Sequence, residues 1–181
     1  MASEYINPET GHLIYVDKDG IILDEACKII YPGSNGDAWW DSEQLLKQAE
    51  KVVVVFEKQF PGWIALFIFD QSSAHGSLSS DALKAFEMNK SDGGKQCKQK
   101  DISIPESNPH PTFRGLVQKM TMPNGDAKGL QRVLEERGFD ICGKAKCKPI
   151  CQPENKDCCM ACLLGNQDNF ANQISQLETL I

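Results

Sequence analysis

The residues best suited to chemistry are cysteines, of which the chain has eight, five of them in one short stretch. The stretch reads C-K-P-I-C-Q-P-E-N-K-D-C-C-M-A-C and contains Cys147, Cys151, Cys158, Cys159 and Cys162. Zinc takes about four soft ligands in a tetrahedron, and thiolates at short spacings around a proline-containing loop can supply them. The pattern is therefore compatible with a structural zinc site in a Cys-rich loop over residues 142–165, with Cys142 as a substitute ligand.

Five thiols in this stretch compete for four positions around one ion. Cys147, Cys151 and Cys158 are the first three ligands in our interpretation. Either Cys159 or Cys162 is the fourth, because the side chains of adjacent cysteines tend to diverge and rarely bind the same ion. The alternative is a set of ordinary or buried thiols, since cysteine is a frequent small hydrophobe in protein cores.

Asp70 is the second candidate for chemistry, in the motif F-I-F-D-Q-S-S-A-H. The nearly continuous apolar run over residues 63–69 predicts a central strand buried on both faces of a sheet. An aspartate at the carboxyl end of such a strand reaches solvent and a metal from a rigid backbone. Gln71 and His75 are supporting residues that can orient a ligand or contact phosphate. The alternative is an aspartate that caps the following turn.

Several predicted elements must position these residues. G-H-L-I-Y-V, a D-K-D-G turn and I-I-L-D-E predict a β-hairpin. Asp41 and Ser42 supply capping oxygens for a helix to about residue 59, where apolar residues recur every three or four positions. The run Val52 to Val55 favours a strand instead, but the helical period continues on both sides of it.

Further helices are predicted over residues 80–88, over residues 128–137 and from about residue 167 to the end of the chain. Leu83, Phe86 and Met88 are the expected buried residues of the first of these helices. Residues 89–125 are rich in Gly, Pro, Asn, Ser and Lys, which predicts a long irregular insertion.

Composition is that of a folded protein, with 181 residues, 41% hydrophobic and 24% charged, and the length predicts a single domain. The net charge of −6 argues against tight binding of nucleic acid. We interpret the lysine-rich stretches near residues 90–100 and 144–148 as solvated loops. The sequence shows no secretory signal and no membrane-spanning run, so we expect an intracellular protein, nuclear or cytoplasmic, with reduced thiols.

Five blocks in order, covering nearly the whole chain, resemble fungal DDE-superfamily, mariner-like transposases. The blocks are Y-P-G-S-N-G-D-A-W-W, L-F-I-F-D-Q-S-S-A-H, D-A-L-K-A-F-E-M-N-K-S-D-G-G-K-Q, K-G-L-Q-R-V-L-E-E-R-G-F-D and D-C-C-M-A-C-L-L. The resemblance implies an α/β fold with a partial RNase H-like core, in which helices flank a mixed sheet. It also implies Mg²⁺-dependent cutting and joining of DNA, with DNA as the partner.

In this resemblance Asp70 corresponds to the second catalytic carboxylate of the family and would bind Mg²⁺. The family's first aspartate would precede Met1, and its last acidic residue would follow Ile181. Because two-metal chemistry needs several carboxylates, we expect residues 1–181 to form a truncated DDE domain that does not cut DNA alone. The alternatives are a domesticated, non-catalytic DNA- or protein-binding module and a small zinc-stabilised domain without a nucleic-acid role.

Overall fold

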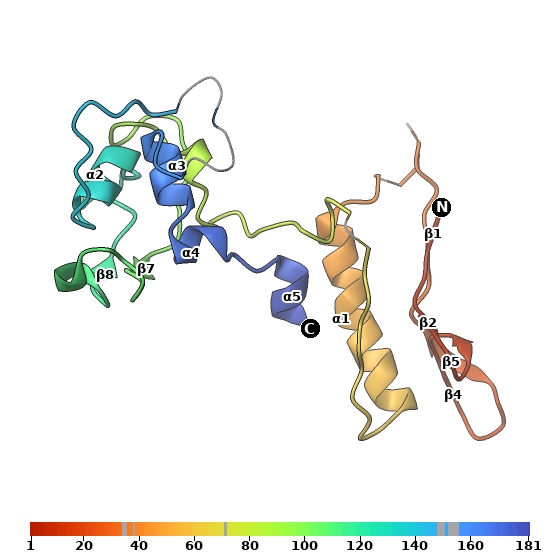
Figure 1. The fold of residues 1–181 in the computed structure, drawn as a ribbon. Coiled ribbons are helices and arrows are strands. Elements are labelled where there is room, and N and C mark those ends of the chain that lie inside the picture. The colour runs from red at the N-terminus through yellow and green to blue at the C-terminus, as the bar shows by residue number, and fades with distance from the viewer. Residues whose placement is uncertain (34–35, 38, 71, 148–150, 152–155) are drawn as a thin grey trace. The chain divides into compact units, whose positions relative to one another are not determined.

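The computed structural model describes residues 1–33, 36–37, 39–70, 72–147, 151 and 156–181. The chain forms two compact units, where its length predicted one domain. Unit 1 comprises Met1–Ser77 and Ile174–Ile181, and unit 2 comprises Leu78–Gln173. Within the described residues every sheet is two-stranded and antiparallel, so the α/β class is confirmed without the mixed sheet of an RNase H-like core (Figure 1).

The predicted hairpin is present in unit 1. β4 (Ile14–Val16) pairs antiparallel with β5 (Ile22–Glu25). Gly20 closes the turn with a φ of +80°, a conformation that glycine adopts without steric cost. Two shorter antiparallel pairs accompany the hairpin, namely β1 (Ala2–Ser3) with β6 (Lys28–Ile29) and β2 (Ile6–Asn7) with β3 (Gly11–His12).

The long predicted helix is also confirmed, as α1 (Ser42–Gln59). Asp41 caps it by accepting a hydrogen bond from the Gln44 N–H at 2.9 Å. Val52 and Val55 are fully buried among residues of the hairpin region, whereas Val54 is 46% exposed. The helical period therefore overrides the strand preference of the valine run, because burying one face of a helix outweighs intrinsic propensity.

Residues 63–69 return along α1 as extended chain, and the prediction of a central buried strand is wrong (Figure 1). Phe67 packs with the apolar cluster that contains Val52, and Phe69 packs with a cluster on the first half of α1. The opposite face, which includes Ile64 at 97% exposed, lies in solvent. No described strand lies beside this apolar run to form a sheet, so residues 63–69 form no strand.

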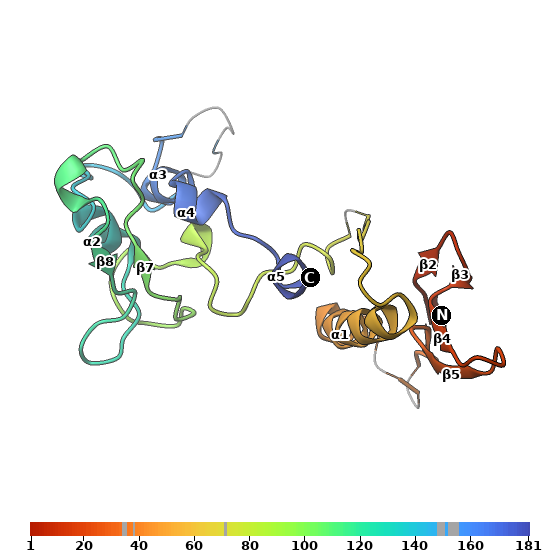
Figure 2. The ribbon, with the colours of Figure 1, turned by 90° about the horizontal axis from the view of Figure 1, so that it is seen from below.

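Unit 2 has its own apolar core, built around three short helices: α2 (Leu130–Glu135), α3 (Met160–Gly165) and α4 (Asp168–Ala171). α3 packs against α2, α4 and the 3₁₀ helix η1 (Ala85–Glu87) (Figure 2). α2 confirms the helix predicted over residues 128–137, with a shorter extent. No helix among the described residues has both the length and the apolarity needed to cross a membrane.

Two helix predictions need correction. The helix expected over residues 80–88 is only the single turn η1, and Phe86 is 57% exposed, although Leu83 and Met88 are buried. The helix expected from residue 167 is interrupted: α5 (Gln176–Leu180), in unit 1, starts afresh from Ser175. Ser175 and Glu178 form a reciprocal capping box, which begins a new helix where the apolar period alone predicted continuity.

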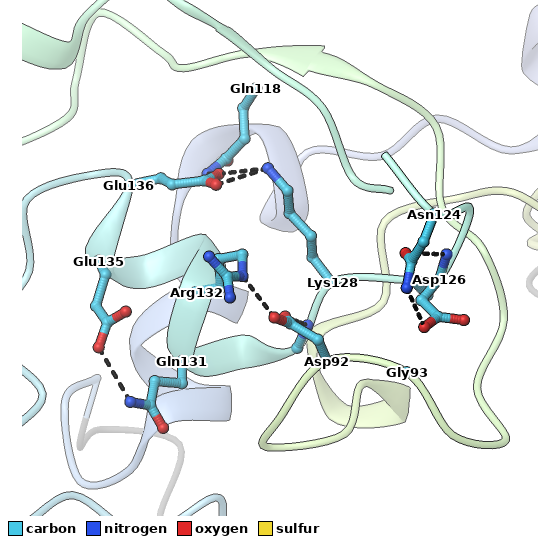
Figure 3. Close-up of polar contacts among 12 residues, drawn as sticks. Asp92, Gly93, Gln118, Asn124, Asp126, Lys128, Gln131, Arg132, Glu135 and Glu136 are labelled. Atoms are coloured by element: carbon cyan, nitrogen blue, oxygen red, sulfur yellow. Dashed lines mark hydrogen bonds and ion pairs between the residues drawn. The ribbon is translucent and has the colours of Figure 1, made fainter. Parts of the chain in front are cut away.

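Residues 89–125 contain little regular structure, namely the pair β7 (Ile102–Ser103) and β8 (Val117–Gln118) and the 3₁₀ helix η2 (Pro111–Phe113). Polar contacts nevertheless tie this segment to α2 (Figure 3). Asp92 accepts a hydrogen bond from the Gly129 N–H at 2.9 Å and pairs with the Arg132 guanidinium. Gln118 donates to Glu136 at 3.1 Å. The segment is therefore an anchored part of unit 2.

Asp92 gives this anchoring a pH dependence. Desolvation acts to raise the pKa of Asp92, but the Gly129 N–H and the Arg132 guanidinium outweigh it and hold the pKa below its ordinary value. A carboxylate with a lowered folded-state pKa stabilises the fold above its unfolded pKa of about 3.9. That stabilisation is lost as the pH falls through the folded-state pKa.

We therefore expect Asp92→Asn to lower the free energy of unfolding of unit 2 by about 1–2 kcal/mol at pH 7. The difference from the wild type should begin to shrink below about pH 4, where the carboxylate of the unfolded chain becomes protonated, and should disappear as the pH falls through the lower folded-state pKa. Urea denaturation at pH 7 and pH 3 measures both. Asp126→Asn, at an exposed position in the same unit, serves as the control and should stay within about 0.5 kcal/mol of the wild type. Equal effects of the two substitutions at pH 7 would contradict the anchoring role.

Candidate metal centre

Four cysteine sulfurs of unit 2 converge into one group, formed by Cys151, Cys158, Cys159 and Cys162. All four Sγ atoms lie within 4.8 Å of one another. Zinc–sulfur bonds of about 2.3 Å in a tetrahedron place the sulfurs roughly 3.8 Å apart. The Cys158–Cys162 and Cys151–Cys159 sulfur pairs lie at 3.4 and 3.7 Å. The thiol group can therefore close around one tetrahedral ion with small movements.

The start of α3 brings three of these sulfurs together. Cys159 is the N-cap residue, and its Sγ accepts a hydrogen bond from the Cys162 N–H at 3.4 Å. Cys158 directly precedes the N-cap, and its Sγ lies 3.4 Å from the Sγ of Cys162 in the helix. Backbone hydrogen bonds from Met160 to Ala145 and from Ala161 to Lys146, both 3.0 Å, hold this helix start against the preceding segment.

The thiol group lies at the edge of the core of unit 2. Cys159 and Cys162 are 0% and 5% exposed and pack in the same apolar cluster as Leu130 and Leu134 of α2. Cys151 and Cys158 are half-buried. Four thiolates fill a tetrahedron and leave no position for water, so this donor set suits a structural zinc ion better than a catalytic one.

Two thiols of the group, those of Cys158 and Cys162, have pKa values above the ordinary value for cysteine. Burial, followed by hydrogen bonding with Cys158, raises the pKa of the Cys162 thiol. Outside the group, the hydrogen bond with Cys151 raises the pKa of Cys147 to about 11. Because zinc binds thiolates, an incoming ion must displace protons, and metal binding is coupled to the local fold.

The group differs from the predicted ligand set in two respects. Cys159 and Cys162 are both present, although we predicted that only one of them would bind. Cys147 lies outside the group, although its Sγ is 3.5 Å from that of Cys151. The adjacent residues Cys158 and Cys159 can share one ion because the chain turns into α3 directly after them. The C-x2-C spacing of Cys159 and Cys162 was the available signal.

Cys142 does not join the group and is not a substitute ligand in this structure. It is exposed, and its backbone N–H donates to the Asp140 carboxylate at 2.9 Å. The predicted loop over residues 142–165 also includes residues 148–150 and 152–155, which lie outside the described part of the chain.

Asp70 lies at the end of the extended segment with its side chain 81% exposed. Its Oδ1 accepts a hydrogen bond from the Ser72 N–H at 3.2 Å and lies 2.8 Å from Nδ1 of His75. Asp70 thus caps the following turn, as the alternative interpretation proposed, and His75 is its partner. Gln71, the other predicted supporting residue, lies outside the described residues.

Asp70 belongs to no group of three or more potential metal ligands within the described part of the chain. A site for two Mg²⁺ ions needs several carboxylates that share the ions. Among the described residues, the only group of three or more His, Cys, Asp or Glu side chains close enough to hold an ion is the cysteine group.

Comparison of the chain with protein-family models, curated proteins and solved structures found no match. The structure therefore defines a mixed α/β protein with a candidate tetrathiolate metal centre.

We expect purified protein to bind one zinc ion, with sulfur ligands from the four clustered cysteines. Cys162→Ser should weaken zinc binding by at least about 100-fold, because loss of outer-shell partners alone costs 10- to 100-fold. Cys142→Ser, which removes an exposed thiol outside the group, should leave the affinity unchanged. Competition with a chromogenic chelator measures both affinities. Equal losses in the two variants, or the absence of bound zinc, would contradict the assignment.

Proposed function

We propose that this chain is a zinc-stabilised, non-catalytic binding module derived from a DDE-type transposase. The observation that carries the proposal is the convergence of four cysteine sulfurs within 4.8 Å at the edge of the core of unit 2. A tetrahedral thiolate site is closed, so the ion stabilises structure and performs no chemistry of its own.

The five sequence blocks support descent from a transposase. In this proposal the ancestral fold is RNase H-like, the ancestral cofactor is Mg²⁺, and Asp70 descends from a catalytic carboxylate. The exposure of Asp70 is compatible with that origin, because a metal-binding carboxylate must reach solvent. Its closest ionisable partner is the imidazole of His75, not a second carboxylate, which supports the loss of cleavage.

Zinc would act on unit 2 by joining a loop residue, Cys151, to the first turn of α3. α3 supplies Met160, Ala161 and Leu164 to the core, so its position matters for the whole unit. A ligand that binds only the folded state stabilises it by about 2.7 kcal/mol at a free concentration 100 times its Kd. Such a contribution is a large part of the stability of a small domain.

A DNA-binding role is the second candidate, and it is favoured by the distribution of charge. Residues 78–173 carry 14 Lys and Arg against 12 Asp and Glu, a net charge of +2. The rest of the chain carries 5 against 13, a net charge of −8. Lys95, Lys98 and Lys100 are exposed and make no ion pair within the described residues. Unit 2 is therefore slightly basic although the whole chain has a net charge of −6, and it can contact phosphates.

Removal of zinc by a chelator should loosen unit 2 selectively. We expect the backbone amides of α3 and α4 to lose protection from hydrogen exchange, because the thiol group fixes the start of α3. The amides of α1, in unit 1, should keep their protection and serve as the internal control. Readdition of zinc should restore the original pattern. Unchanged exchange in α3 after chelation, with loss of zinc verified by elemental analysis, would contradict the stabilising role.

If unit 2 binds DNA, the affinity should fall steeply with salt, because phosphate contacts release counterions. Substitution of Lys95, Lys98 and Lys100 by alanine should make the slope of log K against log salt shallower. Each phosphate contact that is lost reduces the slope by about 0.9, for up to three contacts. The matched control replaces Lys18, Lys47 and Lys51 of unit 1 and should leave the slope unchanged. Fluorescence anisotropy with a duplex oligonucleotide measures the slope.

A slope equally affected by both triple variants would contradict a DNA-binding surface on unit 2. In the same samples, the duplex should remain uncut in the presence of Mg²⁺. Nicking that Asp70→Asn abolishes would contradict the non-catalytic part of the proposal.

A further inference from the structure

Residues 64–69 of unit 1 form an extended segment with an unused backbone edge. Within the described part of the chain, none of their backbone N–H or C=O groups forms a hydrogen bond. Every second side chain points to solvent: Ile64 is 97% exposed, and Leu66 and Ile68 are each 85% exposed. This alternation has the period of two that is typical of a β-strand.

The opposite face of the segment is fixed to unit 1. Phe67 packs against the cluster that contains Val52 and Val55. Tyr5 makes edge-to-face ring contacts with both Phe67 and Phe69, at centroid distances of 6.3 and 6.0 Å. The segment is therefore held in the strand conformation before any partner arrives, which lowers the entropic cost of pairing.

Part of the segment also borders a cavity of about 780 Å³, which is lined by Leu66, Phe67 and Phe69 and by Leu177 and Ile181 near the carboxyl end of the chain. Unpaired strands with apolar side chains act as templates for pairing with another chain. Short segments with high β-propensity and low charge are the ones that pair most readily.

We propose that residues 64–69 pair antiparallel with the same residues of a second copy of this chain. Centred on Leu66, this register places Leu66 opposite Leu66 of the second copy and Ile64 opposite Ile68 on either side. The three exposed aliphatic side chains of each copy then lie on one face and form cross-strand apolar pairs. Such a contact is isologous and closes at two copies, as expected for a two-fold symmetric dimer.

The absence of charge in the segment allows a second copy to approach, and the position of Asp70 favours the antiparallel direction. No charged residue occurs from Phe60 to Phe69, so two copies of the segment can approach without like charges in contact. In the antiparallel register Asp70 faces Gly62 of the second copy, whereas a parallel register would place Asp70 opposite Asp70. The remainder of unit 1 is acidic, and the two acidic units repel at a range that salt screens to about 10 Å at 0.1 M.

This repulsion gives self-pairing a distinctive signature. Dimerisation through an uncharged segment between two acidic units should become tighter as salt is added. Pairing with a basic strand from another protein, or binding of DNA, should become weaker under the same conditions. The inference goes beyond the proposed function and does not depend on the zinc site.

Sedimentation equilibrium of the 181-residue chain, with zinc present, tests the proposal over a range of protein and salt concentrations. We expect a monomer–dimer equilibrium that tightens with salt, and amides of residues 64–69 that gain protection from hydrogen exchange only at dimer concentrations. Leu66→Lys should weaken dimerisation by at least tenfold. Ile22→Lys, which places the same charge on β5 at a side chain 57% exposed, should not.

Three results would overturn the proposal: a monomer at every concentration and salt, a dimer that Leu66→Lys leaves intact, or fast exchange of residues 64–69 in the dimer. Leu66 is 85% exposed, so its replacement should not disturb the monomer fold. Unchanged amide protection in α1 verifies this point. If Leu66→Lys loosens α1, Ile68→Lys provides the same test from the adjacent exposed position.

Discussion

Unit 2 depends on the junction between its thiol group and its apolar core. Cys159 and Cys162 belong to both: their sulfurs are part of the four-sulfur group, and they are buried with the leucines of α2. Helices of about six residues have little stability alone. Forming the first turn fixes several backbone dihedral angles in exchange for a single hydrogen bond, so its free energy is unfavourable. The order of these helices must come from tertiary contacts, and a metal ion at the start of α3 would supply the strongest of these.

Unit 1 is organised differently, around one long amphipathic helix that the hairpin and the extended segment share as a surface. Val52 and Val55 of α1 are completely buried, and the aromatic rings of Tyr5 and Phe67 cover them from outside. This packing uses only one face of the extended segment. The chain therefore combines a unit ordered by apolar packing alone with a unit in which a thiol group joins the apolar core.

The sequence predicted the elements whose signals are local. The hairpin followed from its D-K-D-G turn, and α1 from an aspartate cap and a sustained helical period. The segment over residues 63–69 was misjudged because burial on both faces depends on neighbouring strands, which an apolar run does not reveal. The sequence identified the Cys-rich stretch but not which four of its cysteines come together, since the choice among five cysteines depends on where α3 begins. Ser175 likewise restarts a helix that periodicity alone extends.

X-ray absorption at the zinc edge of the metal-loaded protein tests the central claim most directly, because it reports the number, type and distance of the ligands. The account predicts four sulfur ligands at about 2.3 Å and no nitrogen or oxygen in the first coordination shell. A shell containing oxygen or nitrogen, or fewer than four sulfurs, would contradict a closed tetrathiolate centre at Cys151, Cys158, Cys159 and Cys162.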